Sequence, residues 1–214
     1  MWAMVKWCGM VLTAAVLVQP VALPAAEGSG TDEFIGREAK WTEGIFSIYT
    51  DQNDRNNHYI PSGWMGDYGD IKLDYGCKEK PYSGKNCVKF VYTAEGKQGA
   101  NWAGVFWQNP ANNWGEKKGG FDLRGATKLT FWARGEKGGE RITEFKVGGI
   151  SGAYPDSDSA SIGPIDLTAD WQQYTIFLTN MELSYINGAF CWATNADSNP
   201  EGCTFYLDDI RFEK

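Results

Sequence analysis

Apolar and polar residues alternate in short runs along most of the chain after about residue 41. A period of two predicts β-strands that bury one face, and clusters of Gly, Asn, Asp and Pro separate the runs. No stretch of helical length carries an apolar period of 3.6 residues. We therefore predict an all-β protein with strands at residues 45–49, 71–75, 87–93, 102–108, 128–134, 142–147, 173–178, 188–193 and 204–212.

The segments 128–134 and 142–147 give the clearest hairpin signal. They flank a loop in which Gly135, Gly138 and Gly139 accept the positive φ values of a tight turn, so we expect the two strands to pair. Alternation also assigns faces, because successive side chains of a strand point to opposite sides. The faces expected in the core carry Val88, Phe90, Tyr92, Leu129, Phe131, Ala133, Phe145, Val147, Tyr174, Ile176 and Leu178.

The opposite face of this expected hairpin is both polar and aromatic. One strand would present Thr130, Trp132 and Arg134, and the next would present Glu144 and Lys146. Such a surface in the middle of a sheet is unusual for a purely structural sheet. We therefore predict that it contributes to a binding site.

Residues 1–26 have the pattern of a secretory signal peptide. Lys6 precedes an apolar run at 7–18, and small residues follow up to Ala26. The run is shorter than the roughly 20 residues that a membrane-spanning helix needs, so a membrane-tethering helix is the weaker alternative. We predict cleavage near residue 26, a secreted or periplasmic protein without a membrane span, a flexible lead-in at 27–40 and one domain at 41–214.

Charge and cysteine content indicate which partners the protein can bind and whether it contains disulfide bonds. The chain has 20 basic and 27 acidic residues, a net charge of −7, which makes nucleic acid an unfavourable partner. Cys8 falls in the signal peptide, and the other four cysteines of an exported chain predict disulfides. Three pairings are possible, and Cys77–Cys87 with Cys191–Cys203 is the simplest, because each pair brackets a turn-rich stretch. The Cys and His spacing of a zinc site is absent.

Aromatic residues are densest at 58–70 and 101–115, among Gly, Asn, Asp and Pro. A sugar ring packs its apolar face on an aromatic plane while its hydroxyls need polar partners, so these stretches predict a glycan site. The alternative for each Trp is burial in the core, and Trp102 and Trp107 would lie on opposite faces of one strand. The candidate ligand-binding residues are Trp64, Tyr68, Trp102, Trp107, Trp114, Trp132, Arg134 and Glu144.

Motifs for catalysis are scarce. His58 is the only histidine, and we expect it to have no chemical role. A Gly-x-Ser-x-Gly turn and a phosphate-binding glycine loop are both missing. A glycosidase needs only two carboxylates about 5 to 9.5 Å apart, for which Glu144, Asp156 and Asp158 are the candidates.

The final strand, residues 205–213, resembles the closing strand of galactose-binding-like β-sandwiches, which include many carbohydrate-binding modules. Residues 128–135 resemble their central strand, and residues 165–167 and 171–176 resemble a turn and the segment after it. The resemblance implies an antiparallel β-sandwich of the jelly-roll type, with two sheets, long aromatic-rich loops, and a ligand groove on the concave face or at the loop tips. That face would carry Trp132, Arg134, Glu144 and Lys146.

The pair Asp208–Asp209 stands within this otherwise apolar strand. One of the two must point inward unless the strand bulges, and an inward carboxylate needs a cation or several donors. The resemblance implies a structural calcium ion held by Asp208 or Asp209, with Asp51, which follows an early strand, as a second ligand.

These observations favour a secreted, non-catalytic domain that binds a polysaccharide or another glycan. One alternative is a small glycoside hydrolase or polysaccharide lyase, in which two carboxylates, or a Tyr with Arg134 or His58, meet in one cleft. The other is a structural or adhesive envelope protein, which predicts a flat apolar patch without a polar rim.

Overall fold

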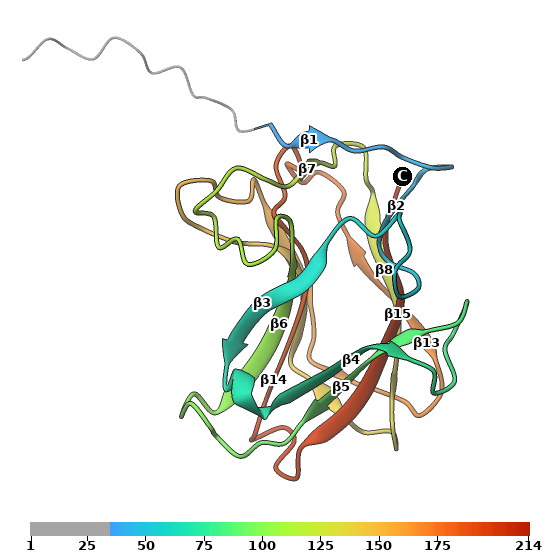
Figure 1. Cartoon of the computed structure of the whole chain (residues 1–214), viewed down its shortest axis with the longest axis vertical. Helices are drawn as coiled ribbons and strands as arrows, with labels where there is room; N and C mark the ends of the chain where they lie inside the picture. Colours follow the sequence, from blue (N-terminus) through green and yellow to red (C-terminus); the bar gives the residue numbers. More distant parts are fainter. Residues whose placement is uncertain (1–34) are drawn as a thin grey trace, which may run out of the picture. The chain divides into compact units, whose positions relative to one another are not determined.

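Two antiparallel sheets packed face to face contain most strands of the computed structural model, which describes residues 35–214 (Figure 1). The first sheet has the order β11 (Ser159–Ile162), β10 (Glu144–Gly148), β14 (Gly188–Asn195), β6 (Trp102–Gln108) and β3 (Ile60–Gly66). The second has the order β13 (Gln172–Phe177), β8 (Lys128–Gly135), β15 (Cys203–Glu213), β5 (Cys87–Tyr92) and β4 (Ile71–Cys77), and β2 (Ile45–Tyr49) pairs with the far half of β15. The predicted antiparallel β-sandwich is confirmed.

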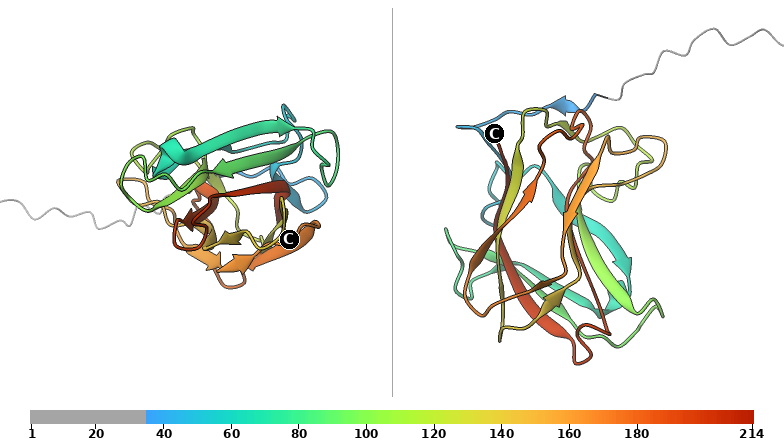
Figure 2. Two further views of the ribbon diagram at one scale, coloured as in Figure 1. Left: turned by 90° about the horizontal axis from the view of Figure 1, so that it is seen from below. Right: turned by 180° about the vertical axis from the view of Figure 1, so that it is seen from behind.

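The remaining elements are short. β1 (Arg37–Glu38) pairs in parallel with β7 (Phe121–Asp122), β9 (Arg141–Ile142) pairs with β12 (Ile165–Asp166), and a single 3-10 turn, η1, covers Tyr68–Asp70. Figure 2 shows the two layers from below and from behind. Within residues 35–214, no helix has the length and apolar character needed to cross a membrane.

The N-terminal predictions fall largely outside the described residues, including the signal peptide at 1–26. The described part of the predicted lead-in is folded. The Gly36 N–H donates to Ser184 O at 2.7 Å, and the Arg37 guanidinium lies 4.4 Å from the centre of the Phe121 ring. The folded part therefore begins before residue 41, because these polar residues pair with β7, a contact that local composition does not reveal.

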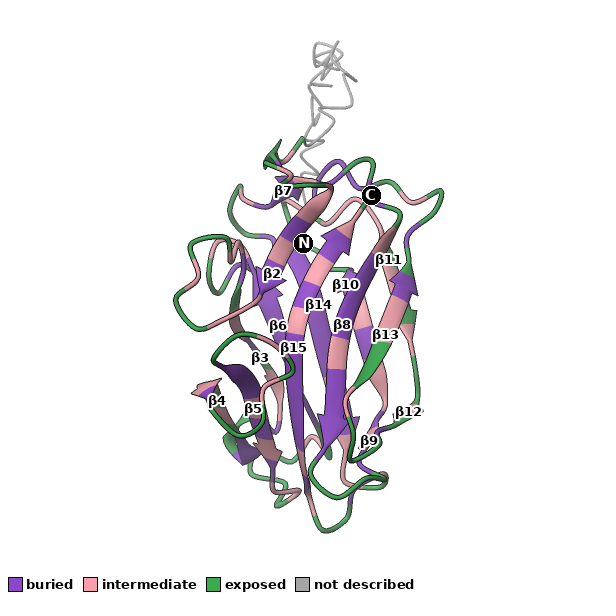
Figure 3. Cartoon of the chain, turned by 90° about the vertical axis from the view of Figure 1, so that its right-hand side faces the viewer, coloured by how far each residue is buried: buried purple, intermediate pink, exposed green. Residues whose placement is uncertain are grey.

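The core lies between the sheets and is rich in aromatic residues. Phe90 of the six-stranded sheet packs against Trp107 and Trp192 of the other sheet, at 5.7 and 4.8 Å between ring centres. The faces predicted from alternation are confirmed: ten of those side chains are buried, and Tyr174 packs partly buried against them. Figure 3 shows how far the buried positions extend along β8, β14 and β15.

The predicted hairpin does not form. β8 pairs with β13 and β15, whereas β10 pairs with β11 and β14 in the other sheet. The loop between them crosses from one sheet to the other, and the buried Glu140 carboxylate holds it by accepting the N–H groups of Lys137 and Gly138. The alternation was interpreted correctly, but a period of two does not reveal which strand is the neighbour.

The four described cysteines are free thiols in this structure. Cys77 and Cys87 face each other across β4 and β5 and share a small buried cluster with Tyr206. Cys191 instead packs outside the main core, and Cys203 belongs to the main core. This placement contradicts the Cys191–Cys203 pairing, because a short turn-rich connection does not require its ends to meet. The Cys77–Cys87 bond stays a prediction.

We expect protein purified from an oxidising compartment to contain one disulfide, Cys77–Cys87. Alkylation of the denatured, unreduced protein followed by peptide mass spectrometry should label Cys191 and Cys203 only. Reduction should lower the free energy of unfolding by about 3 kcal/mol, since a short cross-linked loop restricts the unfolded chain. Labelling of all four cysteines would contradict the prediction.

Candidate functional site

The four residues predicted to share one concave surface lie on two opposite outer faces of the sandwich. Trp132 and Arg134 alternate with core residues of β8 and face outward from the six-stranded sheet. Glu144 and Lys146 alternate with core residues of β10 and face outward from the five-stranded sheet. The single concave surface expected from these four residues is therefore wrong, because their strands belong to different sheets.

On the five-stranded sheet, outward-facing residues line up across the strands. Glu144 lies opposite Ala193, Ala193 opposite Gly104, and Gly104 opposite Met65. In the adjacent row, Lys146 lies opposite Cys191 and Cys191 opposite Phe106. We call this surface the aromatic face, defined by Met65, Trp102, Gly104, Phe106, Trp114, Glu144, Lys146, Ile150, Cys191 and Ala193.

Two indole rings are exposed on the aromatic face. Trp102 is 40% exposed and Trp114 is 36% exposed. Trp102 and Phe106 are four residues apart on β6, or about 13 Å at roughly 3.3 Å per residue, and Trp114 packs edge-on against Phe106 at 6.3 Å. Between Trp102 and Phe106 the sheet surface carries no side chain at Gly104, where a Cβ atom would lie 2.5 Å from Trp192 O. The two rings thus flank a stretch of the sheet longer than one sugar ring.

A polar network holds the loop that carries Trp114. The side chain of the buried Asn113 donates to Lys117 O at 2.8 Å and accepts the N–H groups of Gly115 and Lys117. The Gln108 amide donates to Asn113 O at 3.0 Å. The sequence does not reveal this support, because Asn and Gln in a turn-rich stretch also occur on solvated loops.

A buried carboxylate fixes the entry to β6. Asp67 accepts the N–H groups of Gln98, Ala100 and Asn101 at 2.7 to 2.9 Å, and its own N–H donates to Trp102 O at 2.7 Å. These backbone hydrogen bonds hold the pKa of the Asp67 carboxyl below its usual range. The position of Trp102 therefore depends on Asp67 remaining ionised.

The other candidate carboxylates on this side accept hydrogen bonds from backbone N–H groups. Asp156 accepts the N–H groups of Ile150, Asn187 and Gly188, and burial raises its pKa to about 6. Asp158 accepts the N–H groups of Ser159 and Glu182. Both hold loops in place, which leaves Glu144 as the carboxylate of the predicted trio on the aromatic face.

Three other predicted residues lie outside the aromatic face. Trp107 is 0% exposed between Phe90 and Phe190, so it is a core residue and its prediction as a ligand contact is wrong. Trp64, on the edge strand β3, lies opposite the inward-facing Val105 and so leaves the sheet on its inner side. Tyr68 is exposed in η1, beyond the end of β3.

The opposite outer face contains a pocket of about 640 Å³, which we call the arginine pocket. Of its residues, Arg134 alone was predicted from the sequence to bind a ligand. The pocket is lined by Lys78, Glu79, Lys80, Arg134, Glu136, Ala169, Asp170 and Trp171. Trp132 lies beside it and is half-buried, because Tyr82 stacks on its ring at 3.7 Å. One face of the Trp132 ring, predicted from alternation to be exposed, is therefore covered by a long-range contact.

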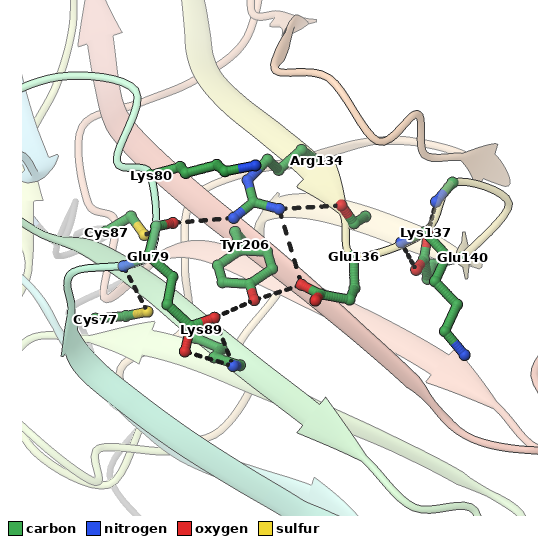
Figure 4. Close-up of polar contacts among 12 residues, drawn as sticks. Cys77, Glu79, Lys80, Cys87, Lys89, Arg134, Glu136, Lys137, Glu140 and Tyr206 are labelled. Atoms are coloured by element: carbon green, nitrogen blue, oxygen red, sulfur yellow. Dashed lines mark hydrogen bonds and ion pairs between the residues drawn. The ribbon is translucent and has the colours of Figure 1, made fainter.

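A network around Tyr206 orders the arginine pocket (Figure 4). The Arg134 guanidinium lies 3.6 Å from the centre of the Tyr206 ring and donates to Glu79 O at 2.9 Å. The Tyr206 hydroxyl lies 2.7 Å from Glu79 Oε2 and 2.6 Å from Glu136 Oε2. Lys89 pairs with Glu79 at 2.8 Å and, with Tyr206, lowers the pKa of Glu79. Two loops and three strands thus meet at one phenol.

The predicted calcium ligands surround the loop that carries Tyr82. β15 bulges after Asp208, and Asp209 takes a φ of 44°. The buried Asp208 accepts the N–H groups of Tyr82, Ser83 and Asp209, and burial raises its pKa to about 7. Asp51 accepts the N–H groups of Lys85 and Asn86.

The Asp51 and Asp208 carboxylates thus accept backbone N–H groups, and the Asp209 carboxylate contacts the Ser83 side chain. No group of three or more His, Cys, Asp or Glu side chains in residues 35–214 is arranged to hold a metal ion. The residues as they stand do not fit a calcium site, and the calcium ion stays a prediction without support from this geometry.

Comparison with known proteins finds this fold in carbohydrate-binding modules. A family 30 module aligns with a TM-score of 0.52 and 16% identity, covering 79% of this chain and 87% of that chain. The family 11 module of the cellulosomal cellulase Lic26A-Cel5E of Clostridium thermocellum aligns with a TM-score of 0.51 and 14% identity, covering 79% and 94%. No protein-family model and no curated protein sequence matches the chain. At these identities the likeness shows the jelly-roll β-sandwich fold.

We expect Asp67→Asn to destabilise the protein at neutral pH, since an amide nitrogen cannot accept the N–H groups that the carboxylate binds. The folded pKa of Asp67 is lowered, so its stabilising effect is present above the unfolded value of about 3.9 and is lost as pH falls through the folded value. Urea unfolding across this range should show the difference from wild type shrinking at acid pH. The exposed Asp197→Asn is the control, and equal stability of both variants would contradict the prediction.

Proposed function

We propose that this chain is an exported, non-catalytic domain that binds a polysaccharide along the aromatic face. The observation that carries the proposal is the exposure of Trp102 and Trp114 on the same sheet face as Glu144 and Lys146. Indole planes accept the apolar faces of sugar rings, and the charged side chains are partners for hydroxyl groups. The signal-peptide pattern at residues 1–26 supports export.

The form of the aromatic face favours a chain over a single sugar. Its two exposed indoles stand more than one ring apart, and glycine and alanine keep the surface between them low. The loops that carry the indoles are held by the buried Asn113 and Asp67, so little conformational entropy is lost on binding. These features support an extended ligand lying along β6, from Trp102 toward Trp114.

The solved structures suggest a first ligand. One family 11 module was crystallised with a β-1,3-1,4-mixed-linked tetrasaccharide, and it aligns with a TM-score of 0.51 and 13% identity. We therefore choose mixed-linkage β-glucan as the first probe, alongside cellulose, xylan and mannan.

An enzyme is the alternative that one observation favours. The Glu79 and Glu136 carboxylates each place an oxygen at hydrogen-bond distance from the Tyr206 hydroxyl, so these two oxygens lie no farther apart than the roughly 5 to 5.5 Å of the carboxyl pair in retaining glycosidases. However, the phenol occupies the space between them, where a glycosidic bond would have to lie. Tyr206 is fully buried, and burial raises its pKa far above the ordinary value. This geometry supports binding over hydrolysis.

We expect Trp102→Ala and Trp114→Ala each to weaken binding to mixed-linkage β-glucan by about tenfold or more, the effect of losing about 1.4 kcal/mol of contact energy. Affinity electrophoresis and calorimetry on the mature protein measure this, with circular dichroism to confirm folding.

Phe177→Ala is the matched control, because Phe177 is 75% exposed on the other sheet. Unchanged affinity in both Trp variants would rule out the aromatic face as the binding surface. New reducing ends in the same reactions would overturn the non-catalytic assignment.

A further inference from the structure

The arginine pocket has the size and rigidity of a small-ligand site. Its volume of about 640 Å³ lies within the roughly 300 to 1,000 Å³ typical of such sites. The Trp171 indole N–H donates to Lys80 O at 2.9 Å, which ties together the two loops that form the pocket and fixes the ring. The pocket is therefore formed before a ligand enters.

Arg134 lies at the bottom of the pocket with unused hydrogen-bonding capacity. Its side chain is 8% exposed, and it carries five N–H donors. Among the described residues, it donates to Glu79 O and Gly135 O, and its buried Nε has no partner. The nearest oxygen of Glu136, at 3.9 Å, is beyond hydrogen-bond distance. Its Nε is enclosed by protein atoms, so the donors available to a ligand oxygen in the pocket are the N–H groups of Nη1 and Nη2 that the bonds to Glu79 O and Gly135 O do not use.

The charges lining the pocket are balanced. Lys78, Lys80 and Arg134 are cationic, whereas Glu79, Glu136 and Asp170 are anionic. A charged ligand would meet as many repulsive as attractive groups. A hydroxyl group both donates and accepts, so it can use the arginine and the carboxylates at once. Trp171, partly exposed in the wall, offers the plane that a sugar ring packs on.

We propose that the arginine pocket is a second sugar-binding site, which takes a neutral pyranose at the end of a glycan. The proposal rests on the proposed function, since it assumes that the chain binds glycans. It differs from that function in place and in ligand form. The aromatic face lies open along a sheet and suits the middle of a chain, whereas the pocket is bounded by the loops at 78–80 and 169–171 and suits a terminal residue.

The test is a titration of the ¹⁵N-labelled mature protein, followed by amide chemical shifts. The probes are glucose, galactose, mannose and xylose, and separately the β-1,3-1,4-mixed-linked tetrasaccharide. We expect at least one monosaccharide to shift amides at 78–80, 134–136 and 169–171 in a saturable way. Trp171→Ala should weaken that binding about tenfold and leave tetrasaccharide binding at the aromatic face unchanged.

Two further variants keep the result interpretable. Glu136→Gln preserves the size of the side chain but removes a charged acceptor, and it should also weaken monosaccharide binding. Phe177→Ala, at the far end of the strand that begins directly after Trp171 and outside the pocket, should not.

The failures of the two proposals are distinguishable. If the tetrasaccharide binds at the aromatic face and no monosaccharide shifts the pocket amides, the pocket proposal is wrong and the proposed function stands. If acetate, phosphate or glucuronate binds the pocket more tightly than every neutral sugar, it is an anion site and the neutral-sugar assignment is wrong. If no sugar binds anywhere, both proposals fail.

Discussion

The contacts of Phe90 and Phe205 with Trp192, and of Phe90 with Trp107, join the two sheets, and the outer faces depend on them. Burial of these rings fixes which side of each strand faces inward, because a shift of one residue would turn every side chain over. With Trp107 in the core, Trp102 and Phe106 must face outward on β6. The same constraint on β8 places Trp132 and Arg134 on the other surface. The core thus decides the composition of both candidate sites.

Sequence pattern predicted what depends on local alternation and failed where the partner strand matters. The fold class and the core positions from Val88 to Leu178 follow from a period of two, and the structure confirms both. The hairpin of β8 and β10 was wrong, since glycines that permit a tight turn also permit a crossing between sheets. The Cys191–Cys203 pairing failed for a related reason, because neighbours in sequence came to lie in separate clusters.

The two candidate sites differ in how far the sequence predicted them. Trp102 and Trp114 stood in turn-rich stretches where burial is difficult, so composition marked the aromatic face. The arginine pocket combines residues 78–80, 134–136 and 169–171, and no single segment of these has an unusual pattern. Trp132 shows the opposite case, because its exposure on a strand face was predicted and Tyr82 covers one face of its ring. Contacts between distant loops are what a single sequence does not contain.

The ends of the described chain lie at one end of the sandwich (Figure 1). β1 pairs with β7 there, and the last residue, Lys214, donates its N–H to Gly44 O at 3.0 Å and places its ammonium 4.6 Å from the centre of the Trp41 ring. The two outer faces of the sheets run away from that end along the strands. A chain segment attached at residue 35 or 214 would therefore hold the domain at one end of its strands and leave the outer faces of both sheets unobstructed.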